Sequence, residues 1–295
     1  MWREESATDV LCWRAAPHLR PVTFNRRQEG HVGADWLWWF VDADTGRAFG
    51  MLCQAKNLKR SAGGWSIGYG QSNSQGSQLT ALLRSAGSLD LPAVYVLYCG
   101  PPSHRRDLSC GPSHTAPQCP RCARAGVSVL SALAAEYLHS YGDADRAATD
   151  SYRTCVPLED LTVSGRCGPL LDPWFGVCPP TVRRFLTQPQ YGSAEVAKQL
   201  LRQLLSFSRG YLFDEGQKLQ SLPPDAVFPA VPQVAGHFSE SVTSHVLRGL
   251  RREAPNYVWA ALEGLNLTTR DLPTEVSEGA AGLIVTRLRN ADPSG

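Results

Sequence analysis

The clearest hydrophobic pattern in the chain is an apolar run followed by a polar turn and a second apolar run. Residues 36–41 are all apolar, residues 42–46 are mostly polar, and residues 47–55 are again mainly apolar. A run without alternating polar positions is typical of a strand that is buried on both faces. The Asp-Thr-Gly sequence at residues 44–46 is typical of a tight turn. The pattern therefore predicts a β-hairpin with a buried first strand.

Further elements flank this hairpin on both sides. Apolar residues at helical spacing predict helices at 4–16 and 78–86, whereas short apolar runs predict strands at 21–25 and 92–99. The last strand follows a helix, and such a crossover favours parallel pairing with an earlier strand. The expected fold class is α/β, with a mixed sheet and the element order α-β-β-β-α-β.

The rest of the chain is less regular. Gly, Ser and Asn are frequent at 61–75, and Pro, Ser and His at 100–118, so we expect both segments to be loops; prolines punctuate a connector at 168–180. Additional elements are expected as helices at 127–141, 194–207 and 240–252 and as a late strand at 283–286. We accordingly divide the chain into an α/β core at 1–100, a Cys- and Pro-rich insertion with a helix at 101–180, and a mainly helical region at 181–290.

Composition places the protein among ordinary globular chains. It has 295 residues, of which 43% are hydrophobic and 19% charged, and its formal net charge is +2. That charge is too small to indicate nucleic-acid binding by itself, so a phosphate-binding surface would have to be a local patch. No apolar run reaches the roughly 18 residues that a membrane-spanning helix requires. Because the N-terminus also lacks the pattern of a secretory signal, we expect a cytoplasmic protein that does not enter the membrane.

The candidate chemistry lies at one end of the hairpin. Side chains alternate between the faces of a strand, so Gln54 and Lys56 share a face while Ala55 points away. Asp35 stands at the start of the opposite strand. A carboxylate and an amide oxygen are ligands that a hard divalent ion prefers, and the Ala55 carbonyl would add a third. The Lys56 ammonium would orient a water molecule and stabilise negative charge on a phosphate.

These residues resemble a known superfamily. The arrangement Asp35 … Gln54-Ala55-Lys56 is similar to the PD-(D/E)XK, or restriction-endonuclease-like, nucleases in their variant with glutamine at the second acidic position. The string from Glu29 through Gly33-Ala34-Asp35-Trp36 to Gln54-Ala55-Lys56 is also similar to bacterial families of unassigned function. The resemblance covers residues 4–100, about a third of the chain. Two positions depart from the commonest motif, namely Ala34 in place of proline and Gln54 in place of an acid.

The resemblance implies a restriction-endonuclease-like core and a nuclease that hydrolyses DNA with Mg²⁺ or Mn²⁺. It further implies Asp35, Gln54 and Lys56 as catalytic residues, with Asp35, Gln54 and Ala55 holding the metal ion. An additional helix-borne acid often assists in this superfamily, and Glu29 and Glu5 are the candidates. Bacterial antiphage defence is the implied setting, and the oligomeric state stays open, with a dimer among the options. The alternatives are a non-catalytic module of the same fold that binds nucleic acid or protein, and a zinc-stabilised interaction protein.

The cysteines suggest a second kind of site. The pair Cys119 and Cys122 forms a Cys-x-x-Cys knuckle, which supplies two ligands of a tetrahedral zinc site. The remaining ligands would come from Cys110 together with Cys99 or His114. Only one knuckle is present, so free thiols are an equally open interpretation.

A basic stripe completes the candidates. On the helix expected at 240–252, Arg248 and Arg252 would be four residues apart and would share a face. Such a stripe is either a phosphate-contacting surface or simply a solvated helix face.

Overall fold

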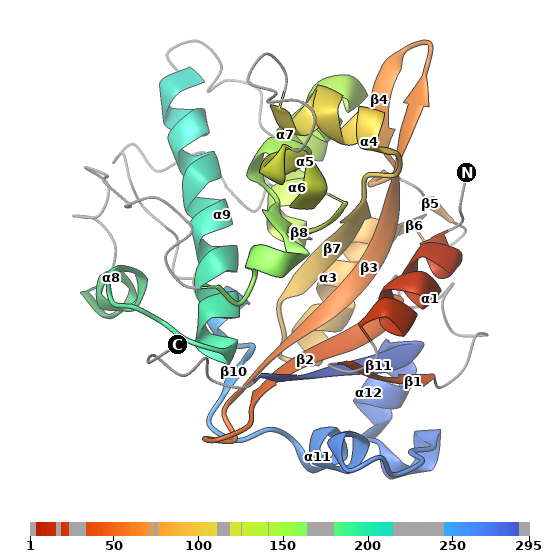
Figure 1. Ribbon diagram of the computed structural model, residues 1–295, viewed down its shortest axis with the longest axis vertical. Helices are drawn as coiled ribbons and strands as arrows, with labels where there is room; N and C mark the ends of the chain where they lie inside the picture. Colours follow the sequence, from red (N-terminus) through yellow and green to blue (C-terminus); the bar gives the residue numbers. More distant parts are fainter. Residues whose placement is uncertain are drawn as a thin grey trace.

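The computed structural model describes residues 4–15, 19–23, 34–70, 72–73, 76–110, 119–124, 126–140, 142–163, 180–214 and 245–288 (Figure 1). A large mixed sheet forms the centre of this part. Its strands lie in the order β1-β11-β2-β3-β7-β8-β9, with β4 and β10 pairing additionally with β3. Their bounds are Leu19–Thr23 (β1), Trp36–Asp42 (β2), Ala48–Ser61 (β3), Gly64–Ile67 (β4), Ala93–Tyr98 (β7), Val127–Ser131 (β8), Val156–Pro157 (β9), Leu250–Arg251 (β10) and Gly282–Leu288 (β11). A separate small hairpin joins β5 (Ser72–Asn73) to β6 (Gly76–Ser77).

The middle of the sheet follows from the apolar pattern of the chain. β2 and β3 pair as an antiparallel hairpin with Trp36 opposite Cys53 and Phe40 opposite Phe49. All seven residues of β2 are buried, as expected for a strand covered on both faces. β7 pairs in parallel with β3, after a crossover that contains helix α3 (Gln78–Ser88). The predicted hairpin, the parallel strand and the mixed α/β fold class are thus confirmed.

The late strand β11 lies between β1 and β2. It runs antiparallel to β1 and parallel to β2. A buried side-chain hydrogen bond supports this pairing, because the Trp38 indole Nε1 donates to Thr286 Oγ1 over 2.8 Å. The strand predicted at residues 283–286 is therefore present, and it joins the first two strands of the chain into one sheet.

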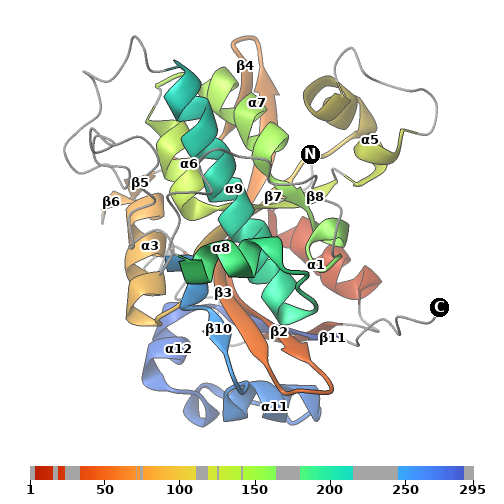
Figure 2. The same ribbon diagram turned by 90° about the vertical axis from the view of Figure 1, so that its left-hand side faces the viewer.

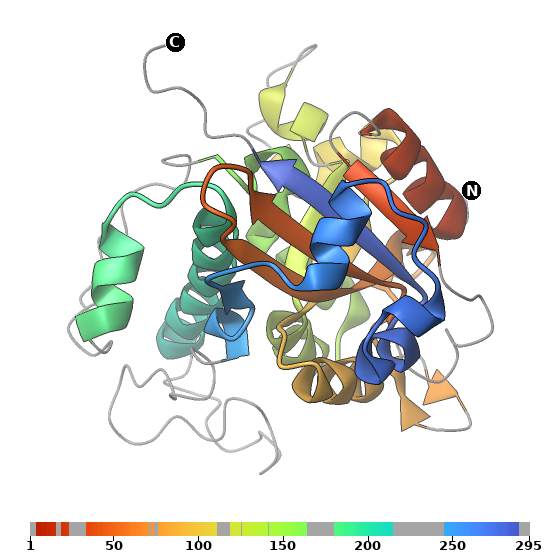
Figure 3. The same cartoon turned by 90° about the horizontal axis from the view of Figure 1, so that it is seen from below.

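Helices cover both faces of the sheet. Helix α1 (Glu4–Arg14) packs against β3 and β1, in front of the sheet in Figure 1, and Figure 3 shows α1 and α3 on opposite faces. Figure 2 shows α6 (Ala132–His139) beside α9 (Ser193–Asp214) and above α3, and α6 contacts both of these helices. The remaining helical segments are α4 (Pro102–Arg105), η1 (Arg106–Cys110), α5 (Pro120–Arg124), α7 (Ala144–Thr154), η3 (Leu158–Asp160), α8 (Pro180–Thr187), α11 (Asn256–Leu262), η5 (Thr269–Asp271) and α12 (Thr274–Gly279).

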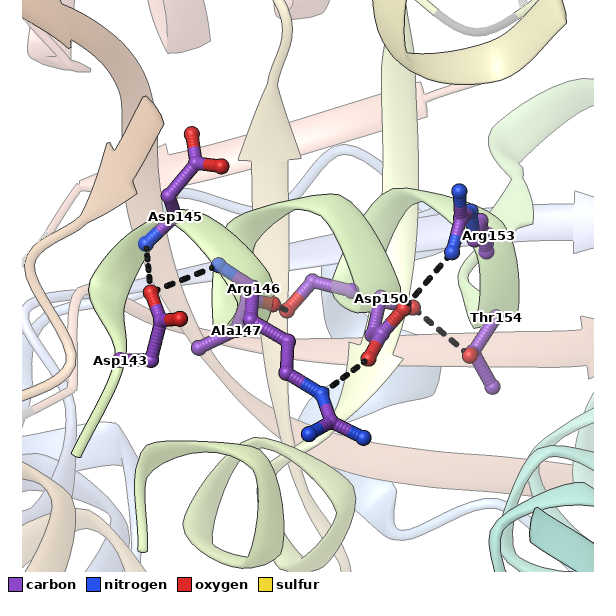
Figure 4. A network of polar contacts seen from close by, with 8 residues as sticks. Asp143, Asp145, Arg146, Ala147, Asp150, Arg153 and Thr154 are labelled. Atoms are coloured by element: carbon purple, nitrogen blue, oxygen red, sulfur yellow. Dashed lines mark hydrogen bonds and ion pairs between the residues drawn. The ribbon is translucent and has the colours of Figure 1, made fainter. Parts of the chain in front are cut away.

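Helix α7 supports the end of the long β3–β4 hairpin, which extends at the top of Figure 1. The carboxylate of Asp143 caps α7 by accepting hydrogen bonds from two backbone N–H groups of the first turn (Figure 4). Asp150 pairs with Arg146 and Arg153 along the exposed face of the helix. Asp145 then accepts a hydrogen bond of 2.6 Å from the backbone N–H of Trp65 in β4. The capped helix thereby fixes the hairpin to the rest of the sheet.

Several expectations were wrong in detail. β3 continues to Ser61 and turns directly into β4, where a loop was expected at 61–75. Residues 127–131 form strand β8, and the predicted helix begins only at Ala132. In the described part of 240–252, only residues 245–247 are helical; a turn follows, and strand β10 then occupies Leu250–Arg251. The connector at 168–180 lies, apart from its last residue, outside the described residues.

Candidate functional site

The candidate site lies where β2 begins and leaves one edge of β3 without a neighbouring strand. The backbone N–H of Asp35 donates to the Cys53 carbonyl over 2.9 Å, which is the last backbone bond of the hairpin. Beyond it, the Asp35 carboxylate takes the place of a strand, since its Oδ2 accepts the Ala55 N–H over 2.6 Å. The Asp35 side chain is therefore fixed in the plane of the sheet, beside the first residue of the Ala55-Lys56 pair.

A second carboxylate caps the same edge. Glu4, in the first turn of α1, accepts the Asn57 backbone N–H at its Oε1 over 3.0 Å. Residues 53, 55 and 57 direct their backbone groups to the same side of β3, because the groups alternate along a strand. Asp35 and Glu4 therefore lie along one strand edge, at the residues on either side of Lys56.

Lys56 is almost completely buried, with 4% of its surface exposed. Its Nζ donates to the side-chain oxygen of Gln78, at the start of α3, over 2.8 Å. Burial lowers the pKa of the Lys56 ammonium below its ordinary value, and the nearby carboxylates of Glu4 and Asp35 oppose this effect by raising the pKa. Desolvation is the larger cause, so Lys56 carries its charge at an energetic cost.

Gln54 is also buried, with 5% of its surface exposed. Its side-chain oxygen Oε1 is enclosed and has no hydrogen-bond partner among the described residues. A buried amide oxygen without a donor costs free energy, which a bound cation or water would recover. The chemistry of Gln54 thus fits the role of a neutral oxygen ligand.

An open groove of about 640 Å³ runs beside this edge, between α1 and the sheet. We call it the acidic groove, because four carboxylates line it: those of Glu4, Glu5, Asp9 and Asp35. Ala55 lines it as well, on the face of β3 that carries α1. Gln54 and Lys56 are not among its described lining residues, because they point to the face that carries α3.

The structure thus brings some of the predicted residues together. The Asp35 carboxylate binds the backbone of Ala55 at the edge of β3, and Gln54 and Lys56 are the neighbours of Ala55 in this strand. Glu5 is exposed and lines the acidic groove, whereas Glu29 lies outside the described residues.

Glu4 was missed by the sequence analysis, although it makes the closer contact with β3. Consecutive helical residues point about 100° apart, so only the orientation of α1 decides which of the two glutamates faces the sheet. The sequence signal was the acidic pair in the first helical turn.

Carboxylate and carbonyl oxygens are the groups at this site that suit Mg²⁺ or Mn²⁺. Asp35 and Glu4 supply the two carboxylates, and Ala55 supplies a backbone carbonyl on the same strand edge. In the part of the chain that the structure describes, no three His, Cys, Asp or Glu side chains converge in a way that would hold a metal ion. A divalent ion would therefore need carbonyl, amide or water oxygens in addition to these two acids.

The cysteine candidates lie just beyond the C-terminal end of β7 and around α5. Cys99 follows β7 and is buried, Cys119 precedes α5 and is buried, and Cys122 lies within α5. Burial raises the pKa of the Cys99 thiol to about 12, and the neighbouring thiols of Cys155 and Cys122 contribute to this increase. His114 and the side chain of Cys110 lie outside the described part.

The predicted basic stripe is wrong as a helix face. The Arg248 guanidinium lies 2.9 Å from Nδ1 of the half-buried His245 ring, and strand β10 begins two residues later. Arg248 and Arg252 therefore do not share the face of one helix.

Comparisons with known proteins place the whole chain in one family. No described helix is both long and apolar enough to cross a bilayer. No curated protein and no solved structure matches the chain significantly. One family matches residues 1–292, and its description is "Family of unknown function (DUF6615)". Because this match spans nearly the full sequence, the chain belongs to the family DUF6615.

Proposed function

We propose that the protein is a metal-dependent nuclease that hydrolyses DNA phosphodiester bonds. The acidic groove would take the scissile phosphate, with Mg²⁺ or Mn²⁺ on the carboxylates of Asp35 and Glu4. Bacterial defence is the setting that the resemblance to PD-(D/E)XK nucleases implies.

One observation carries the proposal. Asp35 and Glu4 come from elements far apart in the fold, yet both carboxylates bind alternate backbone N–H groups of β3 on either side of Lys56. The three charges interact across this strand edge, since both acids raise the pKa of Lys56. Two carboxylates at an open groove, with a buried ammonium of lowered pKa on the same strand, form the kind of cluster that is frequent at functional sites. The order α1, β1, β2, β3, α3 and β7 also supports the resemblance, although β11 separates β1 from β2 in the sheet.

The residues would divide the work as follows. Asp35 and Glu4 are held in place by backbone N–H groups and would bind the cation with their remaining oxygen lone pairs. A bound divalent ion would polarise the phosphate and lower the pKa of an attacking water. Lys56 would stabilise the negative charge that develops on the phosphate, as a point charge held by Gln78.

A non-catalytic binding module of the same fold is the second candidate. The observation that favours it is the burial of Gln54 and Lys56 on the α3 face, away from the groove lining. In a nuclease, Lys56 on this face and the carboxylates of the acidic groove would have to reach the same phosphate around the edge of β3. DNA retention without cleavage is the outcome that would support this second candidate.

The test is a cleavage assay with supercoiled plasmid DNA and with single-stranded RNA, each in Mg²⁺ and in Mn²⁺. Asp35→Asn keeps an acceptor for the Ala55 N–H but removes the charge, and Lys56→Met keeps the length of the side chain. We expect each change to lower DNA cleavage at least about 100-fold. Asp35→Asn should also weaken Mn²⁺ binding in a calorimetric titration without nucleic acid.

Two matched controls separate chemistry from folding. Asp42→Asn alters another buried carboxylate that accepts a backbone N–H, that of Ser193 over 2.7 Å. Lys198→Met removes another buried ammonium, whose Nζ donates to the Gln188 carbonyl over 2.7 Å. Both controls should cleave DNA like the parent protein. Cleavage that survives in Asp35→Asn and Lys56→Met, or a parent protein that cuts neither substrate with either metal, would refute the proposal.

A further inference from the structure

A second groove opens on the same face of the sheet, on the other side of α1. It has a volume of about 900 Å³, within the range of sites for small organic ligands. We call it the basic groove, because its lining includes the basic residues Arg14, Arg60, His104 and Arg105. None of the described residues that line it is acidic, in contrast to the acidic groove.

The walls of the basic groove are apolar. Helix α1 contributes Val10 and Leu11, and the sheet contributes Leu58, Tyr98 and Val127. The hydroxyl of Tyr98 already shares a hydrogen bond of 2.8 Å with Thr8, so its ring is the part that remains for a ligand. These walls suit a flat, uncharged ring system, because moving such a ring from water onto an apolar surface lowers the free energy.

The cationic groups are held in position by neighbouring side chains and carbonyls. The Arg60 guanidinium lies 4.8 Å from the centre of the Trp65 ring, and that ring contacts the His104 ring edge-on at 4.7 Å. Arg105 donates through Nη1 to the Cys122 carbonyl over 3.2 Å. A guanidinium that is already ordered loses less conformational entropy when it binds an anion.

One existing partner competes for Arg60. The Asp107 carboxylate, outside the groove lining, lies 3.6 Å from it, and the Arg60 side chain is 57% exposed. Such an exposed ion pair is weak, so a ligand anion can replace it.

We propose that the basic groove binds a small aromatic anion. The ring system lies on the apolar wall between α1 and β7–β8, and a phosphate or carboxylate group pairs with Arg60 and Arg105. Guanidinium groups recognise both anions through the same pair of parallel hydrogen bonds. A nucleoside monophosphate and an aromatic carboxylate share this chemistry, and the experiment distinguishes them. The inference does not depend on the proposed nuclease activity.

The test uses the full chain and the fluorescent probe 8-anilinonaphthalene-1-sulfonate, which combines an aromatic body with one negative charge. We expect saturable binding of one probe per chain that weakens as salt is added. Competition with AMP, with 1-naphthoate and with inorganic phosphate then identifies which class of anion the groove binds. Displacement by AMP alone indicates a phosphorylated nucleoside, and displacement by 1-naphthoate alone indicates a carboxylate. No saturable binding, or displacement by neither aromatic competitor, overturns the proposal.

Variants locate the binding site. Arg60→Ala and Arg105→Met should each weaken probe binding about tenfold. Arg84→Ala removes an exposed arginine from α3, on the opposite face of the sheet, and should leave the affinity unchanged. If Arg105→Met unfolds, the exposed Arg60 still decides the question, because its replacement leaves the core intact. Equal affinity in Arg60→Ala and the parent protein would place the probe elsewhere and refute the proposal.

Discussion

Replacing Lys56 by methionine should make the protein more stable, although the same change should lower DNA cleavage at least about 100-fold. The reason lies in the environment of the ammonium. Only 4% of Lys56 is exposed, and its pKa is lowered because desolvation outweighs the attraction of Glu4 and Asp35. Methionine has a similar length and an apolar end, so it fills the same space without a buried charge.

The magnitude follows from two opposing contributions. Replacing a buried ion pair by apolar side chains of similar volume is neutral or stabilising by about 1–4 kcal/mol, and the lowered pKa of Lys56 indicates the same direction when its charge alone is removed. The lost hydrogen bond to Gln78 offsets about 1 kcal/mol of this gain. Asp35 and Glu4 keep their backbone N–H partners in the variant. We therefore expect the free energy of unfolding to rise by about 1 kcal/mol.

The difference should depend on pH in a defined direction. Because the pKa of Lys56 is lowered in the folded protein, the folded state releases this proton at a lower pH than the unfolded state does. Stability rises with pH wherever the unfolded state binds more protons. The parent protein should therefore approach the stability of Lys56→Met as the pH rises from neutrality towards the ordinary lysine value of 10.5.

Urea unfolding followed by tryptophan fluorescence measures both effects, at pH 7 and at pH 10. Lys198→Met serves as the reference, since it removes a buried ammonium that donates to a backbone carbonyl. We expect this control to lose stability, because the Gln188 carbonyl loses its donor. A loss of more than about 1 kcal/mol in Lys56→Met at pH 7 would show that the Lys56 charge is a net stabiliser and would refute the reasoning.

Three further predictions concern the fold. Thr286→Val should cost about 1–3 kcal/mol in urea unfolding, because it leaves the buried Trp38 indole N–H without its acceptor. Leu82→Ala should cost about 2–5 kcal/mol in the same assay, since Leu82 is fully buried on α3. His245→Gln should reduce the amount by which the free energy of unfolding falls as the pH is lowered from 7 to 4.5. Burial, with a smaller contribution from Arg248, lowers the pKa of His245 to about 3. The parent protein should therefore lose about 2.5 kcal/mol between pH 7 and pH 4.5, as the unfolded state takes up a proton that the folded state excludes.

Each of these three variants has a control at a more exposed residue of the same type. Thr274→Val changes an exposed threonine, Leu83→Ala a half-buried leucine of the same helix, and His139→Gln an exposed histidine. The controls should have clearly smaller effects in the same measurements. Equal losses in a variant and its control would contradict the assigned contact.

The hairpin and the crossover could be predicted because their signals are local. The apolar run at 36–41 and the turn after it depend on neighbouring residues alone, and both were confirmed. β8 was taken for part of a helix because a short apolar run does not distinguish a strand from a buried helical turn. β4 was missed because the glycines at 63–64 indicate a loop, whereas Gly63 lies in the tight turn after β3 and Gly64 is already the first residue of β4.

The candidate site was predictable only in part for the same reason. Asp35 and the residues at 54–56 belong to one hairpin, so their proximity follows from its register. Glu4 reaches the site through the packing of α1 on β3, and α1 buries none of its residues completely, so no apolar stripe indicates how it is oriented. The basic groove is lined by five separate elements, α1, β3, β7, α4 and β8, a combination that no local pattern of the sequence specifies.

The position of β11 has a consequence for synthesis on the ribosome. Trp38 and its partner Thr286 are 248 residues apart in sequence, and β11 separates β1 from β2. While the chain is still emerging, the edge of β2 that later pairs with β11 is unpaired, and the apolar residues of β2 are exposed to water. An exposed apolar strand edge favours aggregation. We therefore expect newly made chains to depend on chaperones, or on slow translation, until their final strand arrives.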